Sequence, residues 1–337
     1  MATIFVTGGA GFIGSNFIRY WLEKYPGDHI INYDLLTYAG YLENLKDVSL
    51  QHKERYTFIK GDINNYDLVF QLFQHYKPDY IVNFAAESHN SRAILYPDIF
   101  FKTNALGTQT LLHAAKEADI PRFHHISTCE VFGDLALDSD EVFTEQSPYR
   151  PRTPYNASKA SADMAVRAYY ETFNLPVTIS VCANNYGPNQ FPEKLIPHFT
   201  IRLLNGKEMT LYKSSQNRRE WLHVLDHCSA IDAILQNGII GETYNIGSGL
   251  EKNVEDIADL LIQIFKLDAS YKSYVPDRPG HDRRYLLDSS KIRTELGWKP
   301  LINFEDGFTN TVEWYRENQW WWQPLINRLQ VNEEAWK

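Results

Sequence analysis

The run Thr3-Ile4-Phe5-Val6-Thr7-Gly8-Gly9-Ala10-Gly11-Phe12-Ile13-Gly14 decides the fold. Its first five residues form a β-rich segment, and the glycines from Gly9 to Gly14 match the pattern G-x-G-x-x-G. A helical pattern of apolar residues follows, and a second apolar segment, 30–33, ends at Asp34. A strand, a glycine turn, a helix, a strand and an acid in this order predict a dinucleotide-binding unit.

The chemistry of a dinucleotide explains each part of this pattern. Glycines let the backbone approach a pyrophosphate, and the helix N-terminus supplies N–H groups and positive potential. Asp34 is expected to accept hydrogen bonds from the adenosine ribose diol, and its charge repels a 2′-phosphate, so NAD is favoured over NADP. A glycine turn that binds nothing is the alternative. The predicted cofactor-binding residues are Gly8, Gly11, Phe12, Ile13, Gly14, Asp34, Thr37, Asp62, Ile63, Ala85, Ala86, Tyr155 and Lys159.

Strand-like and helical patterns alternate along the first half of the chain. Strands are expected at 56–60, 80–84, 123–127 and 177–182, and helices at 68–76, 99–118 and 155–173. This alternation predicts an α/β fold with a Rossmann-type, doubly wound parallel sheet. The later sequence is less regular and predicts a smaller C-terminal substrate-binding lobe. We expect an NAD-binding Rossmann domain at 1–183 and a mainly substrate-binding lobe at 184–337, with some segments that return to the sheet.

Composition excludes several classes of protein. The 337 residues include 33 basic and 42 acidic side chains, a net charge of −9, which makes nucleic-acid binding a poor hypothesis. No apolar run is long enough to cross a membrane, and the N-terminus shows no signal-peptide pattern. The cysteines Cys129, Cys182 and Cys228 form no disulfide framework and suit a reducing, cytoplasmic location. No metal site is expected.

Tyr155 and Lys159 are four residues apart and lie on one face of the expected helix. A lysine ammonium near a phenol favours the phenolate, and should lower the pKa of Tyr155 from about 10 toward working pH. The phenolate can then take the proton of a substrate hydroxyl while the carbon gives hydride to nicotinamide. Thr128 is expected to share a hydrogen bond with the same hydroxyl, although an ordinary strand-end threonine is the alternative.

These motifs together resemble the extended short-chain dehydrogenase/reductase family. Within it, the sequence is most similar to the nucleotide-sugar 4,6-dehydratases. The resemblance covers nearly the whole chain, and the matching runs are Ala85 to His89, Asn184 to Pro188, Gln190 to Pro197, Trp221 to Val224 and Asp277 to Tyr285. The Trp-rich segment from Trp320 to Trp322 also matches, and we interpret it as packing.

The resemblance implies a reaction and a set of roles. Tyr155 and tightly bound NAD would oxidise a dTDP-glucose-like nucleotide hexose at C4. Glu130 would remove the C5 proton while an acid helps the C6 hydroxyl to leave, and the hydride would return to C6, which regenerates NAD. Substrate contacts are implied for Ser88, His89, Asn185, Lys194, Arg219 and Arg278. The family usually forms homodimers through a four-helix bundle, here built from the helices that start near Asn104 and Tyr155.

Two departures from the family pattern lie at the expected sugar site. Cys129 stands where the family has Asp, at the position of the acid, and Asn90-Ser91 replaces Val-Asp. A thiol, with a reference pKa near 8.5, is already protonated at neutral pH, but it is a weak acid and a weak donor. We favour a chemical role for Cys129 because it lies beside Glu130, and a small space-filling side chain is the alternative.

Three other activities compete with a 4,6-dehydratase. A 5,6-dehydratase acting on UDP-N-acetylglucosamine would return the hydride to C4 and leave a 5,6-alkene, and Cys129 with an intact Glu130 is compatible with it. A nucleotide-sugar 4-epimerase would need Tyr155, Lys159 and NAD but not Glu130. A non-catalytic NAD-binding sensor would have no need for an activated phenol.

Overall fold

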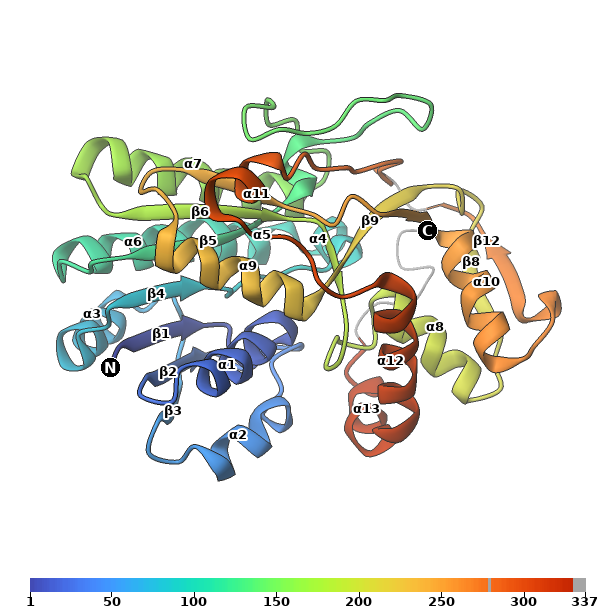
Figure 1. Ribbon diagram of the computed structural model, residues 1–337, viewed down its shortest axis with the longest axis horizontal. Coiled ribbons are helices and arrows are strands. Elements are labelled where there is room, and N and C mark those ends of the chain that lie inside the picture. Colours follow the sequence, from blue (N-terminus) through green and yellow to red (C-terminus); the bar gives the residue numbers. More distant parts are fainter. Residues whose placement is uncertain (278–279, 330–337) are drawn as a thin grey trace.

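The computed structural model describes residues 1–277 and 280–329, and its centre is a seven-stranded parallel sheet (Figure 1). The strand order is β10-β6-β5-β4-β1-β2-β3, and every neighbouring pair is parallel. The strands are β1 (Thr3–Thr7), β2 (His29–Asp34), β3 (Tyr56–Lys60), β4 (Tyr80–Asn83), β5 (Phe123–Thr128), β6 (Val177–Cys182) and β10 (Thr243–Ile246). The predicted doubly wound α/β fold is thereby confirmed.

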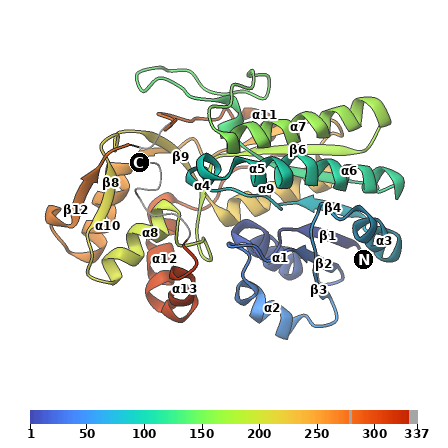
Figure 2. The same cartoon turned by 180° about the vertical axis from the view of Figure 1, so that it is seen from behind.

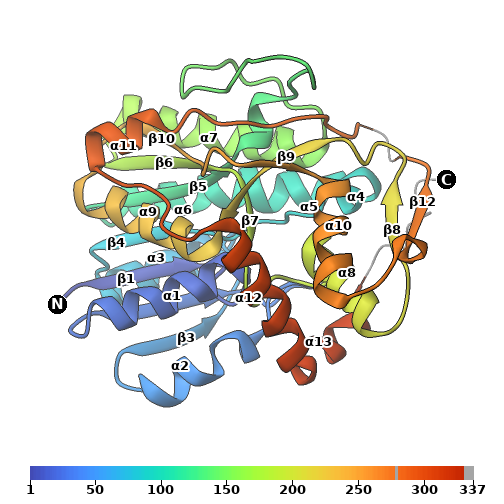
Figure 3. The same cartoon turned by 45° about the vertical axis from the view of Figure 1, so that its right-hand side comes forward.

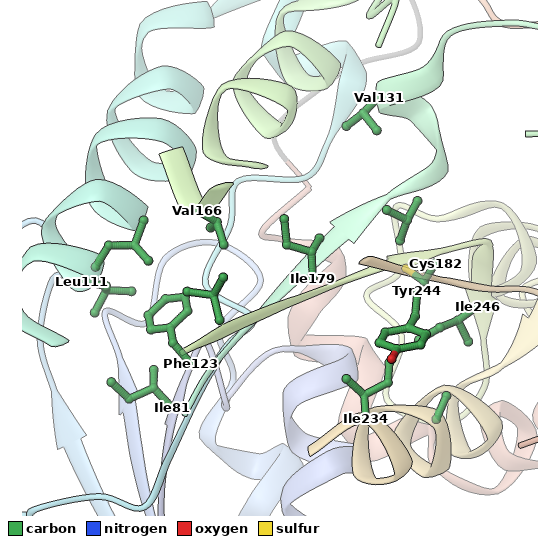
Figure 4. Packing of buried hydrophobic residues seen from close by; sticks show 14 of the residues in the cluster. Ile81, Leu111, Phe123, Val131, Val166, Ile179, Cys182, Ile234, Tyr244 and Ile246 are labelled. Atoms are coloured by element: carbon green, nitrogen blue, oxygen red, sulfur yellow. The ribbon is translucent and has the colours of Figure 1, made fainter. Parts of the chain in front are cut away.

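Helices cover both faces of this sheet (Figures 1 and 2). On one face α3 (Tyr66–Tyr76), α6 (Thr108–Glu117) and α7 (Pro154–Phe173) pack side by side. On the other face α1 (Phe12–Lys24) packs against α9 (Val224–Asn237). Apolar side chains from strands and helices fill the layer between them, including Ile81, Leu111, Phe123 and Val166 (Figure 4).

The helix expected at 99–118 is continuous but not uniform. It consists of α5 (Pro97–Phe100), a π-helical segment η2 (Phe101–Gly107) and α6. Within η2, the amide of Asn104 accepts a hydrogen bond from the Glu87 backbone N–H and donates to the hydroxyl of Ser158. These two hydrogen bonds join the helix to the segment after β4 and to α7.

The C-terminal half builds a smaller lobe beside the carboxyl ends of the strands (Figure 3). Two small sheets, β11-β9-β7 and β12-β8, pack with helices around a separate apolar core that includes Phe199, Leu211, Leu261 and Phe308. The elements of the lobe are β7 (Asn184–Tyr186), α8 (Leu195–Leu204), β8 (Met209–Tyr212), β9 (Arg218–His223), β11 (Glu251–Asn253), α10 (Val254–Phe265), β12 (Lys272–Val275), α12 (Phe304–Glu317) and α13 (Gln319–Ile326).

Two segments of the C-terminal half return to the main sheet. β10 pairs with β6, and α9 packs on the face formed with α1. Tyr244 and Ile246 of β10 lie in the same buried cluster as Cys182 of β6 (Figure 4). A boundary at residue 183 thus remains a prediction about function, since the sheet draws strands from both sides of it.

The Trp-rich segment contributes to packing, as the sequence indicates. Trp321 and Trp322 are buried in a cluster with Tyr38, which follows β2, whereas Trp320 is 54% exposed. The cluster holds α13 against the first half of the chain. The remaining short elements are η1 (Leu42–Leu45), α2 (Lys46–Gln51), α4 (Asn90–Leu95), η3 (Cys129–Phe132), η4 (Ala269–Tyr271) and α11 (Ser290–Leu296). In the described ranges, no helix has the length and apolar character needed to span a membrane.

Candidate active site

The glycine turn after β1 has the geometry that a dinucleotide requires. Gly8 has φ +67°, and a Cβ there would lie 2.6 Å from the backbone N of Ala85. A Cβ on Gly14 would lie 2.5 Å from the carbonyl oxygen of Gly8. α1 begins at Phe12 without a side-chain cap, so its first N–H groups are oriented toward the turn. The turn is therefore a cradle for a phosphate group.

Asp34 ends β2 at the rim of this cradle. Its carboxylate accepts hydrogen bonds from the backbone N–H of Ala10 at 2.9 Å and of Leu36 at 2.7 Å. Burial raises the pKa of Asp34, and these two hydrogen bonds act against that shift. The carboxylate is thus held at the edge where the sequence places an adenosine ribose.

One cavity of about 300 Å³ runs from the glycine turn along the carboxyl ends of the strands. Its wall contains every residue that the sequence assigns to cofactor binding, namely Gly8, Gly11, Phe12, Ile13, Gly14, Asp34, Thr37, Asp62, Ile63, Ala85, Ala86, Tyr155 and Lys159. Thr128, Glu130 and Cys182 lie in the same wall. The cavity fits a long ligand with a phosphate-bearing part at one end and a reactive part at the other.

Tyr155 and Thr128 face each other at the inner end of this cavity. Tyr155 is only 8% exposed, and burial raises the pKa of its phenol well above 10, with the Glu130 charge acting in the same direction. A hydrogen bond with the Thr128 side chain acts in the opposite direction. The expected lowering of the Tyr155 pKa by Lys159 is therefore not seen, because burial dominates.

Lys159 is directed toward the strand rather than toward the phenol. Its ammonium donates to the carbonyl oxygen of Ile126 at 2.7 Å and lies 3.2 Å from Nε2 of His125. That nitrogen is 3.4 Å from Oδ1 of Asp163, which is fully buried. Burial lowers the pKa of Lys159, and the Asp163 charge opposes that shift. Asp163 thus stabilises the buried Lys159 ammonium from the side of His125. The sequence did not indicate this role.

Glu130 lies where the first cavity meets a second one, which extends into the C-terminal lobe. The second cavity is also about 300 Å³ and contains His89, Asn90, Arg219 and Tyr285 in its wall. The residues shared by both walls are Glu130, Asn184, Glu193 and Lys194. Oε2 of Glu130 accepts a hydrogen bond of 2.8 Å from the Asn90 amide. A carboxylate at this junction can reach a ligand in either space.

Cys129 is placed differently from its neighbours. Its side chain is 1% exposed and belongs to the apolar core, and neither of the two cavities has it in the wall. Burial raises the pKa of the thiol well above 9, so the group is protonated at neutral pH. This position favours the space-filling alternative over the chemical role that the sequence led us to prefer.

The implied substrate residues separate into two groups. Ser88 and Asn185 lie in the wall of the first cavity, His89 and Arg219 in that of the second, and Lys194 in both. Lys194 donates to the carbonyl oxygen of Ser88 at 2.8 Å. The guanidinium of Arg219 lies 4.7 Å from the ring centroid of Tyr285. Arg278 lies outside the described residues.

Three site residues were not singled out from the sequence, although each belongs to a quoted run. Glu193 is buried at the junction, where burial raises its pKa to about 7, and it accepts a hydrogen bond of 2.8 Å from Tyr38. Tyr285 lines the second cavity and donates a hydrogen bond to Asp282. Burial raises the pKa of Asp282 to about 6. These three residues could have been identified from the sequence as acidic or phenolic side chains within the long runs that match the family.

No group of three or more His, Cys, Asp or Glu side chains within residues 1–277 and 280–329 could hold a metal ion. The first cavity brings together the phenol of Tyr155, the ammonium of Lys159, the hydroxyl of Thr128 and the carboxylate of Glu130. These groups support proton transfer beside a bound dinucleotide.

A doubly wound sheet with a glycine turn and a Tyr155/Lys159 pair at its carboxyl edge defines a protein of the short-chain dehydrogenase/reductase type. Residues 5–311 match the model of one family, described as GDP-mannose 4,6-dehydratase. The chain belongs to this family, and the resemblance to nucleotide-sugar 4,6-dehydratases is confirmed.

Named relatives and solved structures agree with this assignment. The chain is 46% identical to the dTDP-glucose 4,6-dehydratase of Salmonella typhimurium, over 94% of each chain. The crystal structure of DesIV, a dTDP-glucose 4,6-dehydratase of Streptomyces venezuelae with NAD bound, is 46% identical with a TM-score of 0.92, and the match covers 96% of this chain and 99% of that one. A UDP-glucose 4-epimerase of Thermotoga maritima is also similar, at 29% identity and a TM-score of 0.86, over 94% and 99% of the two chains. The fold alone thus does not separate a dehydratase from an epimerase.

Proposed function

We propose that the protein is an NAD-dependent nucleotide-sugar dehydratase that oxidises a hexose at C4 and eliminates its C6 hydroxyl. The observation that carries the proposal is the presence of Glu130 in one cavity wall with Thr128, Tyr155 and Lys159. An epimerase needs the last three residues but no second base. The activity named for relatives at 44% and 46% identity supports a dTDP-glucose-like substrate.

NAD fits the first cavity because the positive φ of Gly8 and the uncapped start of α1 suit a pyrophosphate. When bound, NAD supplies the acceptor for the C4 hydride and the positive charge of its nicotinamide ring. Tyr155 takes the proton of the C4 hydroxyl, and Thr128 holds the same oxygen by a hydrogen bond. The Asp163 charge opposes the lowering of the Lys159 pKa by burial, but this ammonium faces Ile126 and His125 rather than the phenol, so the positive charge that favours the phenolate is that of the bound nicotinamide ring.

Elimination follows from the ketone formed at C4. The ketone acidifies the C5 proton, and Glu130 removes it from the junction of the two cavities. The C5–C6 double bond forms as the C6–O bond breaks, and the oxygen leaves as water with the proton that Glu130 took from C5. Addition of the stored hydride to C6 and of a proton to C5 gives a 4-keto-6-deoxy sugar.

The second candidate is the 5,6-dehydratase, and Cys129 is the observation that favours it. The family's Asp is replaced by a thiol that is buried away from both cavity walls, so the usual acid is missing at this position. Replacement of the acid at this position can change which carbon of the sugar receives the hydride. If it returns to C4, the 4-hydroxyl is restored and the 5,6-alkene remains.

One labelling experiment separates these activities. The enzyme is incubated with dTDP-glucose and with UDP-N-acetylglucosamine, each deuterated at C4, and the label is followed by NMR. Label at C6 identifies a 4,6-dehydratase, and label at C4 with alkene signals identifies a 5,6-dehydratase. Inversion at C4 without loss of water would identify an epimerase, and binding of NAD without any reaction would identify a sensor.

We also propose a homodimer built on α5–η2–α6 and α7. These helices lie side by side (Figure 2). The large apolar side chains exposed on them are Ile99, Phe101, Leu106, Met164 and Phe173. Pairing with a second copy would bury these apolar side chains away from water, which is favourable. Light scattering should give the mass of two chains, and Leu106→Glu should shift it toward one. The three free cysteines support the proposal of a cytoplasmic location.

A further inference from the structure

Asn90 connects the two halves of the site. It lines the second cavity beside Glu130, and its Nδ2 donates to Oε2 of Glu130 at 2.8 Å. Its Oδ1 accepts a hydrogen bond of 2.7 Å from the hydroxyl of Thr153. Both the nitrogen and the oxygen of the Asn90 amide are thus hydrogen-bonded.

The network fixes which way the amide faces. Oγ1 of Thr153 accepts a hydrogen bond from the backbone N–H of Asn156 at 3.2 Å, as the N-cap of α7. The direction at Asn90 is set by Glu130, because its carboxylate can only accept; the Asn90 oxygen therefore faces Thr153, and the threonine hydroxyl donates to it. The Asn90 N–H₂ group is left to face Glu130, where a carboxylate can only accept. Each hydrogen bond of this network thus pairs a donor with an acceptor.

We propose that Asn90 is a positioning residue for the proton transfer at C5. It holds the Glu130 carboxylate at the junction of the two cavities and connects it by hydrogen bonds to the start of α7, the helix that carries Tyr155. This inference rests on the proposed dehydratase activity. It also gives a role to Asn90 of the Asn90-Ser91 pair, since an apolar side chain at this position could form neither hydrogen bond.

The physical reason is geometric. A glutamate side chain has three rotatable bonds, and a proton transfer needs its oxygen within hydrogen-bond reach of the carbon-bound proton. Anchoring Oε2 to Asn90 limits these rotations and leaves Oε1 for the substrate. Hydrogen bonds to charged groups are among the stronger ones, so losing this bond should slow C5 proton removal by about 10- to 100-fold.

The test measures two rates on the full-length, NAD-loaded enzyme in heavy water. With dTDP-glucose and UDP-N-acetylglucosamine in parallel, absorbance follows reduction of NAD. Mass spectrometry follows removal of the C5 proton, as deuterium uptake at C5 in a 4-keto-6-deoxy product or as loss of water in a 5,6-alkene product, and both are scored as C5 uptake. The variants are Asn90→Asp, which keeps the shape but removes the donor, and Asn90→Ala. The matched control is Asn303→Ala, because Asn303 caps α12 through the N–H groups of Glu305 and Asp306, away from both cavities.

Both Asn90 variants should lose C5 uptake by about 10- to 100-fold while NAD reduction changes by less than about threefold. Asn303→Ala should lower the melting temperature without changing either rate. Wild-type uptake in Asn90→Asp, or an equal fall of both rates, would overturn the inference. If Asn90→Ala does not fold, Asn90→Asp decides. A wild-type enzyme that reduces NAD with neither sugar would refute the proposed function and this inference with it.

Discussion

Replacing Asp163 by asparagine removes the charge that stabilises the Lys159 ammonium. Asp163 is fully buried and is held by hydrogen bonds from Ser127 at 2.6 Å and Tyr149 at 3.0 Å. Its Oδ1 lies 3.4 Å from Nε2 of His125, which lies 3.2 Å from the Lys159 nitrogen. The two charges are therefore no more than about 6.6 Å apart.

The size of the effect follows from this separation. With an effective dielectric constant of about 20, two unit charges at about 6.6 Å attract by about 2.5 kcal/mol. Loss of that energy should raise the acid dissociation constant of the Lys159 ammonium by roughly 70-fold. The pKa of Lys159 is already lowered by burial, so Asp163→Asn should lower it further. We expect catalysis to need a charged Lys159 in the cavity wall, and that charge is then lost at a lower pH.

The assay is the pH dependence of kcat from about pH 6 to about pH 9. In Asp163→Asn the basic limb should move toward neutral pH, with kcat at about pH 9 reduced by up to roughly 70-fold and kcat at about pH 6 little changed. Tyr149→Phe is the control, because it removes one hydrogen bond to Asp163 and keeps the charge. A basic limb at the wild-type position in Asp163→Asn would refute the electrostatic argument.

Tyr155→Phe should abolish turnover while NAD stays bound, as measured by cofactor release on denaturation, and normal turnover would remove Tyr155 from the mechanism. Glu130→Gln should stop deuterium uptake at C5 while NAD is still reduced, and unchanged uptake would place the base elsewhere. If Cys129 has a chemical role, Cys129→Ala should slow C6 elimination more than C4 oxidation in single-turnover measurements, whereas an unaltered rate would leave Cys129 with packing alone. Burial raises the pKa of Glu220 from 4.5 to about 7, so its neutral form stabilises the fold below pH 4.5 and that contribution is lost as the pH rises through 7. In Glu220→Gln the melting temperature should therefore fall less between these two pH values, and an unchanged slope would contradict the assignment.

Local patterns made the sheet and the cofactor side of the site predictable. The strands at 56–60 and 177–182 have the expected bounds, because apolar runs and glycine turns depend on neighbours in sequence. The spacing of Tyr155 and Lys159 fixes their common helix face for the same reason. The cavity then gathers all the predicted cofactor-binding residues in one wall.

Contacts between distant segments were not predictable. Lys159 faces His125 and Asp163 only because α7 packs on β5, and the sequence carries no sign of that pairing. The burial of Cys129 likewise depends on how η3 turns after β5. Asn90 was visible as a departure from a pattern, but its hydrogen bonds to Glu130 and Thr153 join residues far apart in the chain.

The place of β10 at the edge of the sheet has a consequence for synthesis on the ribosome. β6 emerges early, but the strand that covers its outer edge, β10, is made only after the first segments of the C-terminal lobe. Until then the outer edge of β6 has no partner strand, although its side chains are all buried in the complete fold, and such an edge is a template for association with other chains. A fragment ending near residue 183 should therefore aggregate or need a chaperone, even though it would contain every glycine, acid and phenol that the cofactor side requires.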